Sequence, residues 1–158
     1  MKPTAFSTAA GGSSSRPEIE GSTDTELFFF LALTLGLEDD PPSAVERAVG
    51  FIEKTGRTHG VKQPIQMTVA TTNGASLWVF RYSSEGSSRS LFCSTNVATL
   101  RAQYPDNPAL HELSEETRLV VSEPLGDLAG AWNEVPESSY AVVHDGQAEL
   151  HPFSPRPE

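Results

Sequence analysis

Few side chains in this 158-residue sequence are of the kinds that usually do chemistry. Cys93 is the single cysteine, and no histidine lies near it in the sequence to serve as its base. It falls on a predicted strand, where a lone cysteine is more often a small buried apolar residue. No complete catalytic motif occurs, so no catalytic residue is assigned. The histidines show no metal-ligand spacing, so neither a metal nor a cofactor is expected: His59, His111, His144 and His151.

The charge balance excludes two classes of partner. Lys and Arg number 11 against 21 Asp and Glu, a formal charge of −10. Such an acidic chain lacks the basic patch that binds nucleic acid or an anionic membrane surface. The longest apolar run, residues 27–37, is too short to span a bilayer, and we see no secretory signal. A single cysteine allows no internal disulfide and indicates a reducing compartment, the cytoplasm.

A carboxylate stands at the start of the first predicted helix, which runs over about residues 24–35. Thr23 and Glu26 fit the capping box T-x-x-E, and Asp24 between them favours the helix N-terminus. Gly36 is the predicted stop. Apolar residues cover more than one stripe of this helix, so we expect it to be mostly buried and the run Phe28–Phe30 to lie in the core.

A second helix is predicted after Asp40-Pro41-Pro42, since aspartate and proline are typical of a helix start. Residues 38–40 are expected to form a solvated loop with a cap. The spacing predicts an apolar face of Ala44, Val45, Ala48, Val49 and Ile52, and an outward face of Glu46, Arg47, Glu53 and Lys54. The short connection between the helices indicates an antiparallel pair.

From residue 65 the apolar residues alternate, as they do in β-strands. Strands are predicted over 65–71, 77–82, 90–94, 117–122, 139–144 and 147–151, with a short helix over 97–103. Asn73-Gly74 predicts a type I′ hairpin turn, and Asp145-Gly146 is a second hairpin signal. The sheet should therefore be mainly antiparallel.

The strand over 77–82 is largely apolar on both faces. Trp78, Phe80 and Tyr82 share one face, while Leu77 and Val79 share the other. Two helices can cover only one face, so the other is expected to stay uncovered, as in one half of a layered structure. An uncovered apolar face predicts that the isolated chain dimerises, aggregates or unfolds in part.

Four segments in order resemble the class II glutamine amidotransferases, a group of N-terminal-nucleophile hydrolases: Gly21–Glu26, Leu77–Tyr82, Leu119–Leu125 and Trp132–Pro136. The resemblance implies an α+β fold, half of an αββα sandwich, with a helix pair packed on a mainly antiparallel sheet. It implies that residues 18–153 are the C-terminal portion of such a domain. Residues 1–17 are expected to be a disordered lead, and the end of the chain, from residue 152, a loose tail, with 154–158 outside the domain.

The resemblance implies that the parent domain hydrolyses the glutamine amide through a cysteinyl thioester and releases ammonia. It implies that Asp24 pairs with the α-amino group of glutamine or another γ-glutamyl compound; Ser122 and Glu123 are weaker candidates for the site. The family nucleophile is a cysteine after the initiator methionine, where this sequence has Lys2. We therefore expect this chain to be inactive alone and to need a nucleophile-bearing N-terminal half. The alternative is a non-catalytic remnant or module that packs on a partner, or on itself, through the uncovered face.

Overall fold

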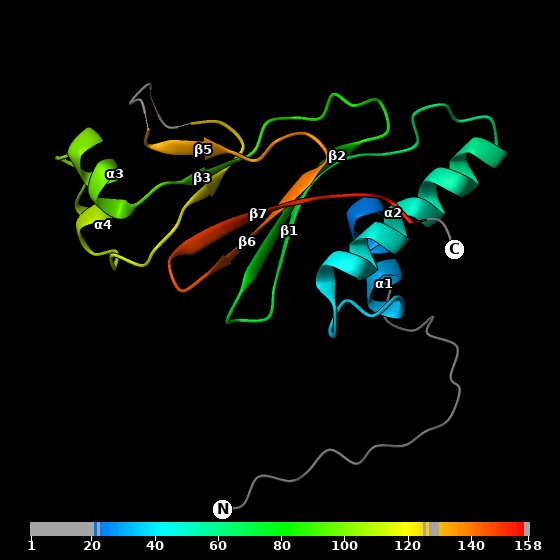
Figure 1. Ribbon diagram of the computed structural model, residues 1–158, viewed down its shortest axis with the longest axis horizontal. Coiled ribbons are helices and arrows are strands. Elements are labelled where there is room, and N and C mark those ends of the chain that lie inside the picture. Colours follow the sequence, from blue (N-terminus) through cyan, green and yellow to red (C-terminus); the bar gives the residue numbers. More distant parts are fainter. Residues whose placement is uncertain (1–20, 22, 125, 127–129, 157–158) are drawn as a thin grey trace, which may run out of the picture.

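A computed structural model describes residues 21, 23–124, 126 and 130–156, so the predicted lead over 1–17 lies outside it. Two helices, α1 (Asp24–Thr34) and α2 (Pro41–Thr58), precede a four-stranded sheet and a three-stranded sheet (Figure 1). The larger sheet has the order β1 (Gln66–Thr72), β2 (Leu77–Ser83), β6 (Ser139–His144), β7 (Gln147–Pro152). The smaller has the order β4 (Val120–Val121), β3 (Phe92–Ser94), β5 (Trp132–Glu134), with α3 (Val97–Gln103) and α4 (Pro108–His111) between β3 and β4. All strand pairs are antiparallel, as predicted.

Both long helices begin at the predicted caps. The Thr23 hydroxyl accepts a hydrogen bond from the Glu26 amide at 3.2 Å, and the Asp40 carboxylate accepts one from the Ser43 amide at 3.2 Å. The Glu26 carboxylate accepts a bond from the amide of Gly21 at 3.1 Å, two residues before the cap residue that we expected as its donor. These bonds satisfy amides that have no partner within the helix.

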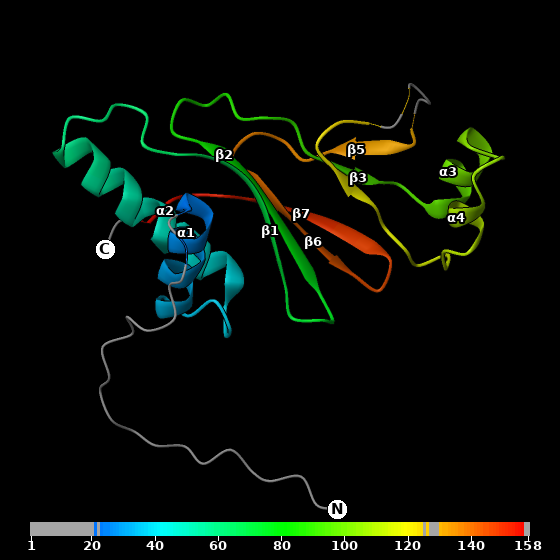
Figure 2. The same ribbon diagram turned by 180° about the vertical axis from the view of Figure 1, so that it is seen from behind.

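The helix pair covers one face of the four-stranded sheet, which confirms the predicted α+β arrangement (Figures 1 and 2). Phe80 on β2 is fully buried beneath the helices, with Trp78 and Tyr82 packed around it. Helix α2 contributes the predicted apolar face, of which Ala44, Val45, Ala48 and Val49 are buried. This layer of side chains is the larger of two cores.

The opposite face of the sheet is also covered, so the prediction of an uncovered face is wrong. Val79 and Ala141 are fully buried there, against Leu91, Cys93 and Val135 from the three-stranded sheet and its flanks. Strands β3 and β4 fall within the strands predicted over 90–94 and 117–122, but the sequence did not indicate that they form a second sheet that covers the first, and β5 was not predicted. The predictions that the chain associates through this face, or binds a partner through it, assumed that the face is uncovered. They are therefore no longer supported.

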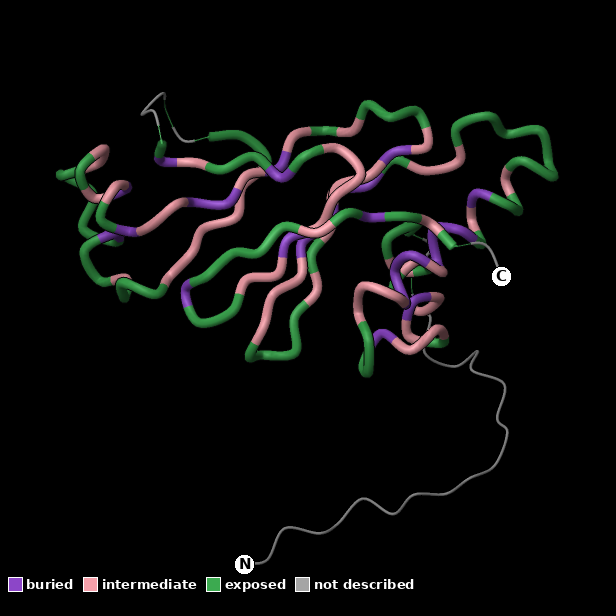
Figure 3. Tube along the Cα trace, in the orientation of Figure 1, coloured by how far each residue is buried: buried purple, intermediate pink, exposed green. Residues whose placement is uncertain are grey.

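Helix α1 is far less buried than its composition predicts. Ala32 is its one buried residue, while Leu27 and Phe29 are 51% and 47% exposed. The helix pair contains residues of all three burial classes (Figure 3). The prediction that the whole Phe28–Phe30 run lies in the core is therefore wrong: Phe28 is half-buried and packs against the core, Phe29 is exposed, and Phe30 is half-buried beside Phe29. A helix that is apolar on all sides packs only one side against the sheet, and here the other side faces outward.

Two glutamates predicted to face outward on α2 are instead buried. Glu46 and Glu53 are each 5% exposed. The Glu46 carboxylate accepts from the Ser154 amide at 3.0 Å and pairs with the Arg156 guanidinium at 2.8 Å, and Phe153 is buried beside them. The prediction of a loose tail is therefore wrong for residues 152–156, because buried polar groups and an aromatic ring hold them.

The two hairpins differ in their turns. Asp145 and Gly146 both have positive φ, 45° and 68°, and form the two-residue turn that this pair predicts. The β1–β2 hairpin instead has a four-residue loop, since Thr72 pairs with Leu77 and only Gly74 of the loop has positive φ. The Asn73 side chain accepts from the Ala75 and Ser76 amides, and these bonds replace the type I′ turn.

Candidate functional site

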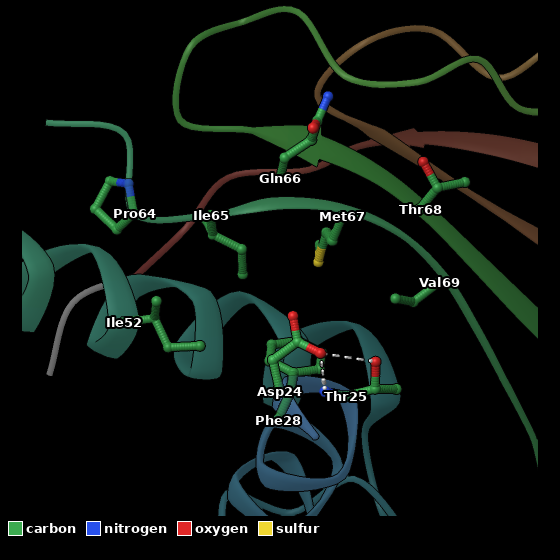
Figure 4. A pocket seen from close by; sticks show the side chains of 10 residues that line it. All are labelled: Asp24, Thr25, Phe28, Ile52, Pro64, Ile65, Gln66, Met67, Thr68 and Val69. Atoms are coloured by element: carbon green, nitrogen blue, oxygen red, sulfur yellow. Dashed lines mark hydrogen bonds between the residues drawn. The ribbon is translucent and has the colours of Figure 1, made fainter. Parts of the chain in front are cut away.

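Asp24 lies at a cavity of about 360 Å³ between the start of α1, α2 and strand β1 (Figure 4). Asp24, Thr25 and Phe28 come from α1, and Ile52 comes from α2. The chain from Pro64 to Val69, which enters and begins β1, supplies the rest. Residues about forty positions apart in the sequence thus form one concave surface around the carboxylate that the sequence singled out.

The helix start holds the Asp24 carboxylate in place. One oxygen, Oδ1, accepts from the Thr25 amide at 2.8 Å and faces the Thr25 hydroxyl at 3.4 Å. The other oxygen points into the cavity toward Met67 (Figure 4). The partial positive charge of the helix N-terminus attracts a negative side chain at this position. Asp24 is therefore oriented to receive a cation from the cavity.

The wall opposite Asp24 is apolar. Ile65, Met67 and Val69 of the β1 segment point toward α1, whereas Gln66 and Thr68 point away (Figure 4). The side chains of Gln66 and Thr68 bond the carbonyl oxygens of Ser87 and Arg89, at 3.2 and 3.3 Å. Among the described residues that line the cavity, Asp24 alone is charged. Next to apolar surface, a carboxylate is best compensated by an ammonium group that it also hydrogen-bonds.

Sequence reasoning missed the β1 side of this cavity. The alternation over residues 65–71 identified the strand, but nothing in it indicated contact with the first helix. The signal was the apolar face of the strand, Ile65, Met67 and Val69, which needed a helix to cover it. Since two helices were predicted, the sequence did not reveal which of them would meet this strand.

The weaker candidates lie elsewhere. Ser122 and Glu123 follow β4 in the three-stranded sheet, well separated from α1 in both views (Figures 1 and 2). Both are exposed, and the Ser122 carbonyl accepts from the Ser90 hydroxyl at 2.7 Å. Cys93 is 2% exposed on β3, and burial raises the pKa of its thiol. A buried thiol with a raised pKa is a poor nucleophile, so the packing role predicted for Cys93 agrees with its place in the fold.

A serine, a histidine and an aspartate meet where the two hairpin loops of the larger sheet approach each other. His144 Nδ1 lies 3.1 Å from the Ser76 hydroxyl oxygen, and Nε2 lies 3.1 Å from a carboxylate oxygen of Asp145. Nδ1 also lies 3.1 Å from the Ala75 carbonyl oxygen, which can only accept a hydrogen bond. In the tautomer whose Nδ1–H donates to that carbonyl, His144 cannot take a proton from Ser76, and the side chains of His144 and Asp145 are 54% and 83% exposed. Within the described residues, no three His, Cys, Asp or Glu side chains are grouped so as to hold a metal ion.

Fold and site together define an α+β protein in which the first helix presents a carboxylate to a cavity beside an edge strand. The chain is similar to a solved structure of a glutamine aminotransferase class-II domain protein from Silicibacter pomeroyi, with a TM-score of 0.70 and 30% sequence identity. The match covers 87% of this chain and 55% of that one. No protein-family model and no curated protein matches the chain.

This match confirms the resemblance found in the sequence: the chain has the structure of part of a class II glutamine amidotransferase domain. It spans about half the length of the solved chain that it matches. None of the helices in the described part of the chain is long and apolar enough to cross a membrane.

Proposed function

We propose that this chain supplies the substrate-amine-binding part of a domain that hydrolyses the side-chain amide of glutamine. In this proposal residues 18–153 are the C-terminal portion of the domain, which acts in the cytoplasm. The observation that carries it is the Asp24 carboxylate, fixed by Thr25 with one oxygen directed into the cavity. The similarity to a glutamine aminotransferase class-II domain protein supports it.

Asp24 binds the α-ammonium group of the substrate in this proposal. A charge-assisted bond from ammonium to carboxylate is about twice as strong as a neutral hydrogen bond. The ammonium belongs to the part of glutamine that does not react, so the bond positions the amide without taking part in its cleavage. Because Asp24 contacts only the ammonium end, other γ-glutamyl compounds satisfy it equally.

The chemical step belongs to a cysteine outside the described residues, on the nucleophile-bearing portion of the domain. Its thiolate attacks the amide carbon, the carbon–nitrogen bond breaks, and the nitrogen takes a proton and leaves as ammonia. Water then attacks the thioester, which releases glutamate and restores the thiol. The buried Cys93 takes no part in this sequence.

Glutamine binding to the intact 158-residue chain tests the role of Asp24. We expect added glutamine to shift the NMR amide signals of residues 24–28, and N-acetylglutamine, which lacks the ammonium group, to leave them in place. Asp24→Asn should weaken binding at least about tenfold, the equivalent of one lost charge-assisted bond.

Thr23→Ala is the matched control, because it weakens the same helix start by about 1 kcal/mol and leaves the carboxylate in place. It should bind glutamine as the wild type does. The proposal is wrong if N-acetylglutamine shifts the same signals, or if Asp24→Asn binds glutamine as tightly as Thr23→Ala.

A further inference from the structure

We infer that a second cavity, between the α1–α2 turn and the β1–β2 hairpin, binds a small organic amine, in which an apolar body carries an ammonium group. The cavity has a volume of about 410 Å³, within the range typical of small-molecule sites. Helix α1 and the turn after it line one side, and the end of β1 with the start of β2 lines the other. The inference uses neither Asp24 nor the proposed function.

Apolar and aromatic side chains form much of the cavity wall. The buried Leu37 contributes to it, and two aromatic rings come from separate elements, Phe29 from α1 and Trp78 from β2. Phe29 is 47% exposed. An apolar ligand body would cover part of this ring, and removing apolar surface from water favours binding. Aromatic faces in addition attract a cation.

Two carboxylates without a partner lie on the same cavity. Glu38 and Asp39 line it and are both exposed. Across the described part of the chain, neither carboxylate takes part in a hydrogen bond or an ion pair. The next carboxylate, that of Asp40, caps α2 instead. Since the described lining residues include no Lys, Arg or His, the charge complementary to this cavity is positive.

The fold brings the carboxylates and the rings together from both sides. Gly36 has a φ of 96°, and the Leu37 amide donates to the Ala32 carbonyl at 3.1 Å, so the chain turns sharply at the end of α1. This turn buries Leu37 and leaves the two acidic residues after it exposed. On the other side, the register of the hairpin pairs Trp78 with Thr71, and both line the cavity. The turn and the hairpin loop lie at the same side of the molecule in both views (Figures 1 and 2).

The class of ligand follows from these two kinds of surface. A neutral apolar molecule would leave the carboxylates unpaired. A metal ion needs several ligands, and the described chain holds no group of three His, Cys, Asp or Glu side chains that could supply them. An ammonium group on an apolar body satisfies both surfaces, because it donates charge-assisted bonds to a carboxylate while its body packs against the rings.

A pair of probes that differ only in charge tests the inference. We would titrate 2-phenylethylammonium and 2-phenylethanol, which has a hydroxyl in place of the ammonium group, into the 158-residue chain carrying Asp24→Asn. That substitution prevents capture of the amine in the first cavity. We expect the amine to shift the NMR signals of the Trp78 indole and of the Glu38 and Asp39 amides, and to bind at least about tenfold more tightly than the alcohol. The indole of Trp132, whose nitrogen is buried in the other sheet, is the internal reference and should not shift.

Charge variants separate the cavity from the general acidity of the chain. Glu38→Gln with Asp39→Asn should weaken amine binding about tenfold, so that the amine and the alcohol bind alike. Asp106→Asn with Glu112→Gln is the matched control, because it removes the same two charges at exposed sites around α4. The control should bind the amine as the chain with native charges does.

Aromatic variants test the other surface. Phe29→Ser should weaken binding of both probes, whereas Phe51→Ser on α2, a residue with the same 47% exposure outside the cavity lining, should leave it unchanged. The inference is overturned if the alcohol binds as tightly as the amine, if the two variants of either pair act equally, or if the amine binds the wild type but not Asp24→Asn. No readout involves glutamine, so this site and the proposed function fail separately.

Discussion

Glu53 shows how a residue that sequence patterns place in water becomes part of the interior. Its carboxylate accepts from the Tyr82 and Ser84 hydroxyls, each at 2.7 Å, and from Arg57 at 2.8 Å. Burial by itself would raise the pKa of Glu53, but these bonds and the charge of Arg57 outweigh it and hold the pKa below its ordinary 4.5. Burial and the same carboxylate raise the pKa of Tyr82. The cluster ties α2 to the end of β2.

Because of Glu53, the free energy of unfolding should decrease at acid pH. Between the lowered pKa of folded Glu53 and 4.5, the unfolded chain binds a proton that the folded chain does not. The free energy of unfolding should therefore be insensitive to this group above pH 4.5 and decrease as the pH falls below it. Urea unfolding at several pH values should show a shallower acid decrease for Glu53→Gln. Glu149→Gln, at an exposed site, should keep the wild-type slope, and an equal change in both variants would contradict this account.

At the scale of elements, the turns decide which strands can meet. Gly74 and Gly146 both have positive φ, 88° and 68°, but they differ in their surroundings. A Cβ at Gly146 would lie 3.0 Å from the Glu116 Cα and 3.1 Å from its carbonyl oxygen, whereas nothing lies within 4 Å of one at Gly74. The β6–β7 turn is therefore packed against the segment before β4.

The two glycines should respond unequally to alanine. Gly74→Ala should cost about 1 kcal/mol of unfolding free energy, the cost of an alanine at positive φ. Gly146→Ala should cost about 2–3 kcal/mol, since it adds steric overlap with the Glu116 backbone. Urea unfolding of both variants measures the difference. Equal costs would mean that the Glu116 segment moves aside freely.

At the scale of the whole molecule, Arg81 joins the two sheets. From β2 its guanidinium donates to Glu134 of β5 at 2.5 Å, to the Val135 carbonyl at 2.8 Å and to the Ser88 hydroxyl at 3.1 Å. Glu137 lies 3.8 Å away. Burial would raise the pKa of Glu137, but bonds from Ser88 and Ser83, with the charge of Arg81, lower it. The second face of the larger sheet is thus closed by polar contacts as well as apolar packing.

Removing this link should loosen the smaller sheet. Arg81→Met should lower the unfolding free energy by about 2–3 kcal/mol, because the Val135 carbonyl loses a charged donor and Glu137 loses a nearby positive charge. Hydrogen exchange of β3 and β5 should speed up more than that of β1. Arg89→Met, at an exposed site nearby in the chain, should stay within about 0.5 kcal/mol of the wild type. Unchanged exchange in β3 and β5 would contradict the role of Arg81.

Local structure was determined by the sequence itself. The caps at Thr23 and Asp40, the turn at Asp145-Gly146 and the bounds of α3 all match prediction. Each depends on interactions between residues that are close in the chain, so a short pattern contains the whole cause. The likeness to class II glutamine amidotransferases also came from short segments, and it marked Asp24 before its surroundings were known.

Only the tertiary structure decided which elements bury which side chains and which faces of the sheets. Burial of Glu46 depends on Arg156, and burial of Glu53 depends on Tyr82, partners that no helical periodicity reveals. The cover over Val79 comes from residues such as Cys93 and Val135 of the second sheet and its flanks, and the strand pattern over 90–94 did not show which face they would cover. The cavity at Asp24 exists because β1, about forty residues away, lies beside α1. Such contacts join residues distant in sequence, so their energies are absent from any local pattern and appear only when the chain is packed.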